Sequence, residues 1–274
     1  MSGASQLDEL VAVVLAPNPS PMTLEGTNTY ILTRPGSGDA VVVDPGPELP
    51  DHRAAIEAAI AERDAQPVAV VLTHHHRDHA AAAGWSSGWG AQLYAFAPSR
   101  VPGDAVALRD GAAVRAGGVV IAAVHTPGHA SDHLCLRIED SGAVLTGDHV
   151  LGRGTTVVYW PDGDMGAYMT SLRRLAAIGA PVLYPGHGPT VEDPAVVVAE
   201  YLAHREEREA QVLAAIDAGE RTAGAIVARV YAEVDAVLHP AAERSVKAHL
   251  KKLAAEGRIP AGLEPAAPQE ERHG

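Results

Sequence analysis

The feature that most constrains this chain is VLTHHHRDHAAA at residues 71–82, where four histidines and an aspartate follow an apolar run. VAVVLT (68–73) is rich in valine, which predicts a buried strand that delivers the chain to the edge of a sheet. In the extended H-x-H that follows, His74 and His76 point the same way and His75 points the opposite way. His74 and His76 can therefore hold one metal ion together, and His75 cannot join them.

After this pair the chain must turn, because DHAAAAGW is a good helix start with Asp78 as a candidate N-cap. Asp78 and His79 are expected on that first turn, displaced from His74 and His76. This geometry suits a second ion close to the first, with mixed nitrogen and oxygen ligands. A catalytic zinc usually takes about three protein ligands and leaves one position open, so two ions need more ligands than this segment supplies.

Further residues of the ligand type follow other apolar runs. His129 lies in VHTPGHASDH, Asp148 in AVLTGDHV and His187 in VLYPGHG, and each has a glycine beside it. A glycine lets the backbone turn sharply or approach a neighbour closely. Because the same arrangement recurs after separate strands, we expect these residues to converge on one site.

The remaining pattern predicts an α+β fold of packed sheets with helices outside. Short apolar runs that end at Gly, Pro or Asp indicate strands over 10–16, 29–33, 40–46, 68–73, 92–96, 118–126, 133–140, 143–148 and 181–187. Several are apolar throughout, which predicts that both faces of the sheet are covered. Residues 51–64 and 166–179 have helical spacing, the latter with Met169, Leu172, Leu175 and Ile178 on one stripe.

From Pro194 the pattern is almost entirely helical. A long helix is followed by helices expected over 222–234 and 241–257, and RIP (258–260) is interpreted as the start of a wing strand. We therefore expect a catalytic domain over 1–193, a helical, winged-helix-like region over 194–265 and a disordered polar tail over 266–274.

Composition limits the partners and the compartment. The formal net charge is −13, and such an acidic chain is a poor match for a phosphate backbone. No apolar run approaches the roughly 18 residues of a membrane span, and the first residues lack the pattern of a secretory signal. The single cysteine, Cys135, excludes an internal disulfide and is interpreted as a small core residue, so the cytoplasm is the expected location.

The set THHHRDH, TPGHASDH, TGD and PGHG resembles the metallo-β-lactamase superfamily, an αββα sandwich with a binuclear metal site. Within it, NPSPMTLEGTNTYIL, LGRGTTVVYW, YPGHGPTV and HLKKLAAEGRI are similar to the β-lactamase-like protein 2 group. The resemblance implies that His74, His76 and His129 hold the first metal, that Asp78, His79 and His187 hold the second, and that Asp148 bridges them. Two zinc ions are expected, and the ligand set also admits manganese or iron.

The resemblance also suggests residues that contact substrate. In the family, the loop MTLEGTNTY runs beside the metals, which makes Thr27 and Asn28 candidates. Thr155 and Thr156 follow the bridging aspartate and are expected to border the cleft. His133 is expected to bond to a metal ligand or to bound substrate.

Other polar residues carry weaker expectations. His125 and His149 are interpreted as supporting groups, and His52, His204, His239 and His249 as solvated. Arg244, Lys247, Lys251 and Lys252 form a basic stripe on the last helix. Such a stripe is usually a solvated face, but it is the strongest local positive charge in this chain and could serve a substrate or partner.

Two metal ions about 3.5–4 Å apart lower the pKa of a bridging water to roughly 7, and the resulting hydroxide can attack an ester-like bond. Asp78 would orient this hydroxide or return a proton to the leaving group, and Asp148 would hold the two metals together. A hydrolase is therefore expected, although the oligomeric state does not follow from the sequence.

The favoured substrate is a thioester or ester of a small or carrier-bound acyl group, because fungal carrier-protein thioesterases resemble the same group. A single-strand-specific endoribonuclease, acting on single-stranded RNA, and a glyoxalase II-like hydrolase are the alternatives. A non-catalytic metal-binding module is least favoured. Lactam hydrolysis as the main role is disfavoured, because the common zinc β-lactamases have a cysteine ligand where this chain has Asp148.

Overall fold

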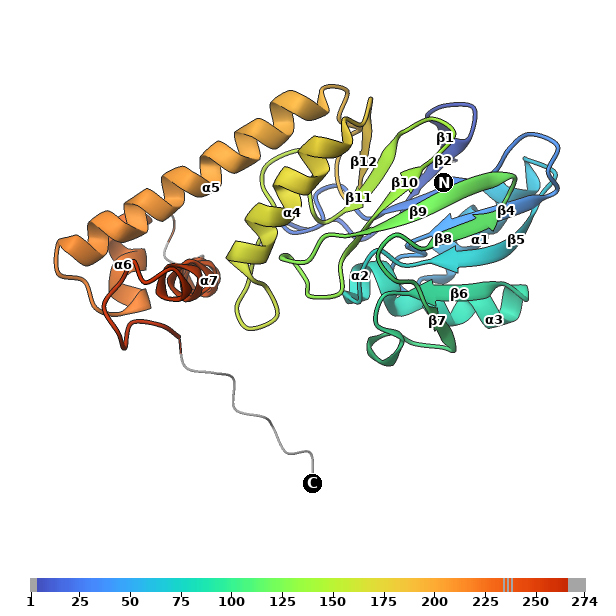
Figure 1. Cartoon of the computed structure of the whole chain (residues 1–274). Coiled ribbons are helices and arrows are strands. Elements are labelled where there is room, and N and C mark those ends of the chain that lie inside the picture. The colour runs from blue at the N-terminus through green and yellow to red at the C-terminus, as the bar shows by residue number, and fades with distance from the viewer. Residues whose placement is uncertain (1–3, 234, 236, 238, 266–274) are drawn as a thin grey trace.

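Two β-sheets packed face to face form the core of the N-terminal two thirds of the chain, with helices on both outer faces (Figure 1). The computed structural model describes residues 4–233, 235, 237 and 239–265. Within these residues the first sheet has seven strands in the order β1-β2-β3-β4-β5-β6-β7, and the second has five in the order β12-β11-β10-β9-β8. The expected αββα sandwich is therefore confirmed.

The strands of the first sheet are β1 (Ser5–Gln6), β2 (Val11–Leu15), β3 (Asn28–Leu32), β4 (Asp39–Val43), β5 (Gln66–Val71), β6 (Gln92–Ala95) and β7 (Ala105–Ala107). Those of the second are β8 (Ala113–Ala116), β9 (Val119–His125), β10 (Leu134–Ile138), β11 (Val144–Gly147) and β12 (Leu183–Pro185). Each of the nine expected strand segments overlaps one of these strands. The short β1, β7 and β8 were not expected.

Alternation along Ala40–Val43 of β4 shows why these residues are all apolar. Val41 and Val43 pack between the two sheets, whereas Ala40 and Val42 pack under the outer helices. Those helices include α1 (Pro50–Ala61) and α3 (Trp85–Trp89). Successive strand side chains point to opposite faces, so a strand covered on both sides must be apolar at every position. Full burial of each valine contributes about 1.5–3 kcal/mol.

The outer face of the second sheet is covered by α4 (Met165–Ile178) and the first half of α5 (Pro194–Asp217). Helix α4 begins where the Asp164 carboxylate accepts a hydrogen bond from the Ala167 amide, and it ends at Gly179 with φ of 65°. Both ends follow the usual capping chemistry. Of the predicted stripe, Met169, Leu172 and Leu175 are buried and Ile178 is partly buried.

The second half of α5 extends away from the sandwich and packs with α6 (Ala223–Val230) and α7 (His239–Ala255) around a small core of its own (Figure 1). Helix α7 also contacts α4, so this C-terminal unit packs back against the helical layer of the β-sandwich. The expected wing strand at RIP was wrong, because residues 258–260 are not in a strand. The expected tail, 266–274, lies outside the described residues.

Two histidines expected to be solvated are instead buried. His52 on α1 is 1% exposed, and its Nε2 lies 2.9 Å from the Thr29 hydroxyl. His249 on α7 is completely buried. Cys135 is buried in the core beneath α4, as expected. Of the helices that the structure describes, none combines the length and apolarity that a bilayer span needs.

Candidate metal centre

The candidate metal centre lies where several strands end. Strand β5 leads directly into Thr73 and the THHHRDH segment, β9 leads toward His129, β11 ends before Asp148, and β12 ends before His187. Strands β4, β5 and β6 are parallel, as are β11 and β12, so their carboxyl ends meet at the same edge of the sandwich. The strand ends thus gather side chains that lie more than a hundred residues apart.

Three histidines form the first group. His76 Nδ1 lies 3.0 Å from His74 Nε2 and 2.9 Å from His129 Nε2. Tetrahedral coordination at a Zn–N distance of about 2.0–2.1 Å separates ligand nitrogens by roughly 3.3 Å. The observed spacing is close to that value, so the three nitrogens can face a common metal ion.

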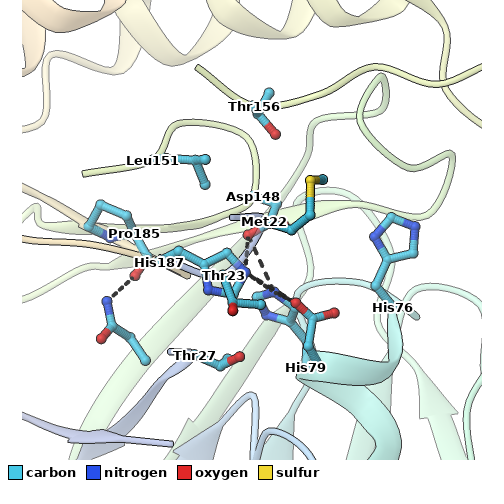
Figure 2. Close-up of polar contacts among 12 residues, drawn as sticks. Met22, Thr23, Thr27, His76, His79, Asp148, Leu151, Thr156, Pro185 and His187 are labelled. Carbon is cyan, nitrogen blue, oxygen red and sulfur yellow. Dashed lines mark hydrogen bonds and ion pairs between the residues drawn. The ribbon is translucent and has the colours of Figure 1, made fainter. Parts of the chain in front are cut away.

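Asp78, His79, Asp148 and His187 form the second group, and their candidate ligand atoms lie within 4.8 Å of one another. His187 Nε2 lies 3.2 Å from His79 Nε2, 3.2 Å from Asp78 Oδ2 and 3.3 Å from Asp148 Oδ1. Figure 2 shows His79, Asp148 and His187 directed toward one another, with Met22 and His76 beside them. This is a mixed nitrogen and oxygen set of the expected composition.

Asp148 lies between the two groups. Its Oδ1 is 3.3 Å from both His79 Nε2 and His187 Nε2, whereas its Oδ2 is 3.5 Å from His129 Nε2. Oδ1 is buried and has no hydrogen-bond partner among the described residues. A buried carboxylate oxygen without a donor is costly unless a cation satisfies it, so the residues present fit a bound metal.

Glycine allows this close packing. A Cβ at Gly186 would lie 2.6 Å from His79 Cε1 and 2.8 Å from Asp148 Oδ1. Any side chain at this position would therefore displace the second group. The glycine beside His187 serves close approach, as the sequence suggested.

The outer ring nitrogens of four histidines are hydrogen-bonded, which fixes the direction of the inner ones. In each case Nδ1 meets an oxygen, so the ring donates there and presents the lone pair of Nε2 to the centre. The pairs are His74 with Thr73 Oγ1 at 3.0 Å, His79 with Asp44 Oδ2 at 2.8 Å, His129 with the Val157 carbonyl at 2.7 Å and His187 with the Gly26 carbonyl at 3.1 Å.

Asp44 supports both groups and was missed by the sequence analysis. One oxygen accepts from the Thr73 amide at 2.8 Å, and the other accepts from the Thr73 hydroxyl at 2.7 Å and from His79. Its backbone is left-handed, with φ of 51°. Asp44 directly follows the apolar run of β4, so the rule that pointed to Asp148 could also have found it.

The electrostatics differ between the groups. Burial holds the pKa of His74 well below its usual value, and the neighbouring histidines His79 and His76 lower it further. Burial also opposes a charge on His187, but Asp148 and Asp78 outweigh burial and raise its pKa to about 9. The first group thus favours neutral imidazoles, the form that binds metal. In the second group the carboxylates stabilise a positive charge between them, whether on a histidine or on a bound cation.

Asp78 occupies a different place in the turn from the one expected. The helix α2 (Arg77–Ala80) has His76 at its N-cap, so Asp78 lies within the first turn. Its carboxylate is directed to His187 instead of capping the helix. Burial favours the neutral acid, yet His79 and His187 outweigh it and lower the pKa of Asp78 to about 2.

His75 is turned away, as its position in the extended segment predicts. Its Nδ1 lies 2.8 Å from Asp132 Oδ1, and its Nε2 accepts a hydrogen bond of 2.9 Å from Arg100. Arg100 also lies 3.0 Å from Asp162. The Arg100 guanidinium therefore occupies the position next to His75 and Asp162 that a metal ion would otherwise take.

Most of the residues expected to contact substrate are buried beneath the candidate ligands. His133 is buried, and its Nε2 accepts a hydrogen bond of 3.2 Å from the Asp148 amide, so it supports the backbone of a candidate ligand. Thr156 is buried with its hydroxyl 3.3 Å from His129 Nδ1, whereas Thr155 is exposed. Thr27 is buried, and the Asn28 amide donates to two carbonyls of the turn that carries His187.

A cavity of about 340 Å³ opens beside the centre. Its lining comprises Met22, His76, Asp78, His129, Asp148, Val157, Tyr159, Trp160, Pro161, Asp162 and Arg244. The wall is thus largely apolar and aromatic, with candidate ligands at one part and charged residues at another. Thr155 and Thr156, which were expected to border the cleft, do not line this cavity, and neither do the substrate-contact candidates Thr27 and Asn28. Val157 and residues 159–162 line it instead.

The architecture agrees with comparisons to known proteins. The model of the metallo-β-lactamase superfamily matches residues 22–90 and 85–187, and that of the β-lactamase-associated winged helix domain matches residues 222–261. The chain belongs to the metallo-β-lactamase superfamily of hydrolases and carries the winged helix domain associated with it.

Individual relatives agree with this assignment over most of the chain. The β-lactamase-like protein 2 homolog of Caenorhabditis elegans is 32% identical over 92% of this chain and 86% of its own length. An atrochrysone carboxyl ACP thioesterase of Aspergillus chevalieri is 38% identical over 78% of this chain and 68% of its own. The crystal structure of a metallo-β-lactamase family protein from Thermus thermophilus superposes with a TM-score of 0.75 at 27% identity, covering 90% of this chain and 94% of that one.

Proposed function

We propose that this protein is a binuclear metal-dependent hydrolase that cleaves thioesters or esters of small or carrier-bound acyl groups. The observation that carries the proposal is the position of Asp148, whose two oxygens face the two groups at 3.3 and 3.5 Å. A single metal would need only one group. Two groups joined by one carboxylate match the arrangement of two-metal hydrolases.

In this proposal His74, His76 and His129 hold the first ion, Asp78, His79 and His187 hold the second, and Asp148 contacts both. Two bound ions, zinc by preference, would activate a water molecule and polarise the carbonyl of the substrate. The ligand types suit zinc, and they also suit manganese or iron.

The protein residues would position the substrate and manage the proton. Asp78 is the more accessible carboxylate of the centre, with a side chain 30% exposed against 11% for Asp148, and both line the cavity. Asp78 is therefore the carboxylate placed to orient the attacking water or to pass a proton to the leaving thiolate or alkoxide. Asp148 is too buried to exchange a proton with the substrate, and its role is to link the two groups of ligands.

Two observations favour an acyl substrate. The apolar and aromatic wall formed by Val157, Tyr159 and Trp160 suits a hydrocarbon or polyketide chain. The relative from Aspergillus chevalieri is named a thioesterase of an acyl carrier protein. The net charge of −13 argues against a nucleic-acid backbone as the substrate.

A side-by-side assay tests the proposal. Acyl thioesters on N-acetylcysteamine and on a carrier protein, an aryl ester, lactoylglutathione and unstructured RNA are incubated with the purified protein and with Asp148→Ala. Asp140→Ala removes an exposed aspartate paired with Arg34, away from the centre, and serves as the control. We expect carrier or N-acetylcysteamine thioesters to be hydrolysed by the parent and the control and not by Asp148→Ala.

Other outcomes separate the alternatives. Cleavage of RNA alone, lost in Asp148→Ala, would identify an endoribonuclease, and a clear preference for lactoylglutathione would identify a glyoxalase II-like enzyme. If Asp148→Ala hydrolyses thioesters as fast as the parent, the proposed centre is not where the reaction occurs.

A further inference from the structure

One permanent positive charge lines the cavity beside the candidate centre. Arg244, on α7 of the C-terminal unit, borders the same space as His76, Asp78 and Asp148. It is the one lysine or arginine among the described residues that line this cavity. The C-terminal unit therefore contributes directly to the wall of the site, and not only to the packing of α4 and α5.

The neighbours of Arg244 on the basic stripe are already paired. Lys247 lies 2.7 Å from Glu243 and Lys251 lies 3.3 Å from Asp164. Lys252 is likewise paired, with Glu209 on α5 and with Glu256, which directly follows α7. Across residues 4–233, 235, 237 and 239–265, no aspartate or glutamate lies within ion-pair distance of Arg244. Its guanidinium is thus the member of the stripe left available to an external anion.

Contacts with the cavity wall hold Arg244 near the site. Its guanidinium carbon lies 5.7 Å from the centre of the Tyr159 ring, within the range of a cation–π interaction. Its backbone carbonyl accepts a hydrogen bond of 3.4 Å from the Trp160 amide. On the next turns of α7, Lys251 lies 4.3 Å from the Trp160 ring centre. The wall segment and α7 are therefore joined by three contacts.

We propose that Arg244 is a specificity-determining residue that binds an anionic group, a carboxylate or a phosphate, on the substrate. The inference rests on the proposed hydrolase function, because it assumes that the scissile bond lies at the metal centre. The planar guanidinium fork matches both anions in a bidentate manner, which a lysine does not. In a chain of net charge −13, one free arginine in the cavity would select among acyl substrates by charge.

The two possible sources of the anion are distinguished by matched substrates. For the acyl side, glutaryl and pentanoyl thioesters of N-acetylcysteamine differ by a terminal carboxylate in place of a methyl group. For the thiol side, pentanoyl thioesters of pantetheine and of 4′-phosphopantetheine differ by the phosphate. The ratio of kcat/KM for each charged and neutral pair is measured for the parent, Arg244→Gln, Arg244→Lys and Lys247→Gln.

We expect Arg244→Gln to lower the charged-to-neutral ratio of one pair about 10- to 100-fold, as loss of a charge-assisted hydrogen bond does. Arg244→Lys should recover only part of this loss, and the control Lys247→Gln should keep the parent ratio. A loss in the glutaryl pair places the anion on the acyl chain, and a loss in the phosphopantetheine pair places it on the thiol. Parent-like ratios for Arg244→Gln in both pairs would overturn the inference.

A binding measurement separates this inference from the proposed function. Amide analogues of the same four compounds, in which nitrogen replaces the thioester sulfur, are titrated by calorimetry. If the parent hydrolyses none of the thioesters, the hydrolase proposal fails, yet a preference for a charged amide that Arg244→Gln abolishes still supports the anion site. If no charged amide binds more tightly than its neutral partner, the anion site is refuted whatever the hydrolytic activity.

Discussion

Asp44 accepts a hydrogen bond of 2.8 Å from His79 Nδ1, and both side chains are buried. The same carboxylate accepts from the amide and the hydroxyl of Thr73, whose hydroxyl also meets His74. One buried carboxylate therefore orients a histidine in each group. Such outer partners typically change metal affinity about 10- to 100-fold when removed.

The first prediction is that Asp44→Asn weakens metal binding by about that factor. An asparagine presents an NH₂ group where Thr73 and His79 now donate, so the His79 ring would lose its partner and its fixed tautomer. Competition with a chromophoric chelator measures the affinity. Asp39→Asn is the control, because Asp39 lies exposed at the other end of β4. Unchanged affinity in Asp44→Asn would mean that Asp44 has only a backbone role at Thr73.

The second prediction concerns metal stoichiometry. Purified protein should contain close to two metal ions, and His187→Ala should retain about one, because it removes a nitrogen from the second group alone. Elemental analysis by mass spectrometry provides the count and the identity of the metal. His204→Ala, on α5, should keep both ions. One ion or none in the unmodified protein would contradict the binuclear proposal.

The sequence predicted the local geometry of the site better than it predicted which distant residues meet there. The alternation of an extended chain was enough to separate His74 and His76 from His75. The recurrence of a ligand residue beside a glycine after separate strands predicted that His129, Asp148 and His187 converge. Their assignment to particular metals depended on the family resemblance, because spacing along the chain does not say which strand ends meet.

Arg244 could not be placed at the cavity from the sequence, because that depends on how α7 folds back onto the segment 157–162. The prediction that His52 and His249 are solvated was wrong for a related reason. Patterns of helical spacing count histidine as polar, yet α1 buries His52 beside Thr29 and α7 buries His249. In both cases tertiary packing decided the environment.

The third prediction tests how α5 supports the centre. The buried guanidinium of Arg205 donates a hydrogen bond to the Thr156 carbonyl, and the Val157 carbonyl next to it accepts from His129. Arg205→Met should cost about 1.5–3 kcal/mol, the usual value for a hydrogen bond to a charged group, and lower the Tm by several degrees. Arg173→Met removes an exposed ion pair with Glu206 and should change stability by less than about 0.5 kcal/mol. Equal Tm values for the two variants would show that Arg205 is not an anchor.

The fourth prediction concerns acid stability and His249. Neither ring nitrogen of this buried residue has a hydrogen-bond partner in the described part of the chain. Burial lowers the pKa of His249 to about 3, and the nearby basic side chains of Arg205, Lys252, Arg208 and His204 act in the same direction. Because the unfolded chain takes up the proton at its ordinary pKa of 6.5, this site favours unfolding as the pH falls from 6.5 toward 3.

Between pH 7.5 and pH 5.0 the shift of His249 should cost about 2 kcal/mol of unfolding free energy. His249→Leu has no proton to take up, so its stability should fall by about 2 kcal/mol less than that of the parent over the same interval. Urea unfolding followed by circular dichroism at the two pH values measures the difference. His249→Met, a second apolar replacement, should behave in the same way, because the effect depends on the missing titration and not on a particular shape. Parallel losses of stability in the parent and both variants would show that His249 does not titrate between the folded and unfolded states in this range.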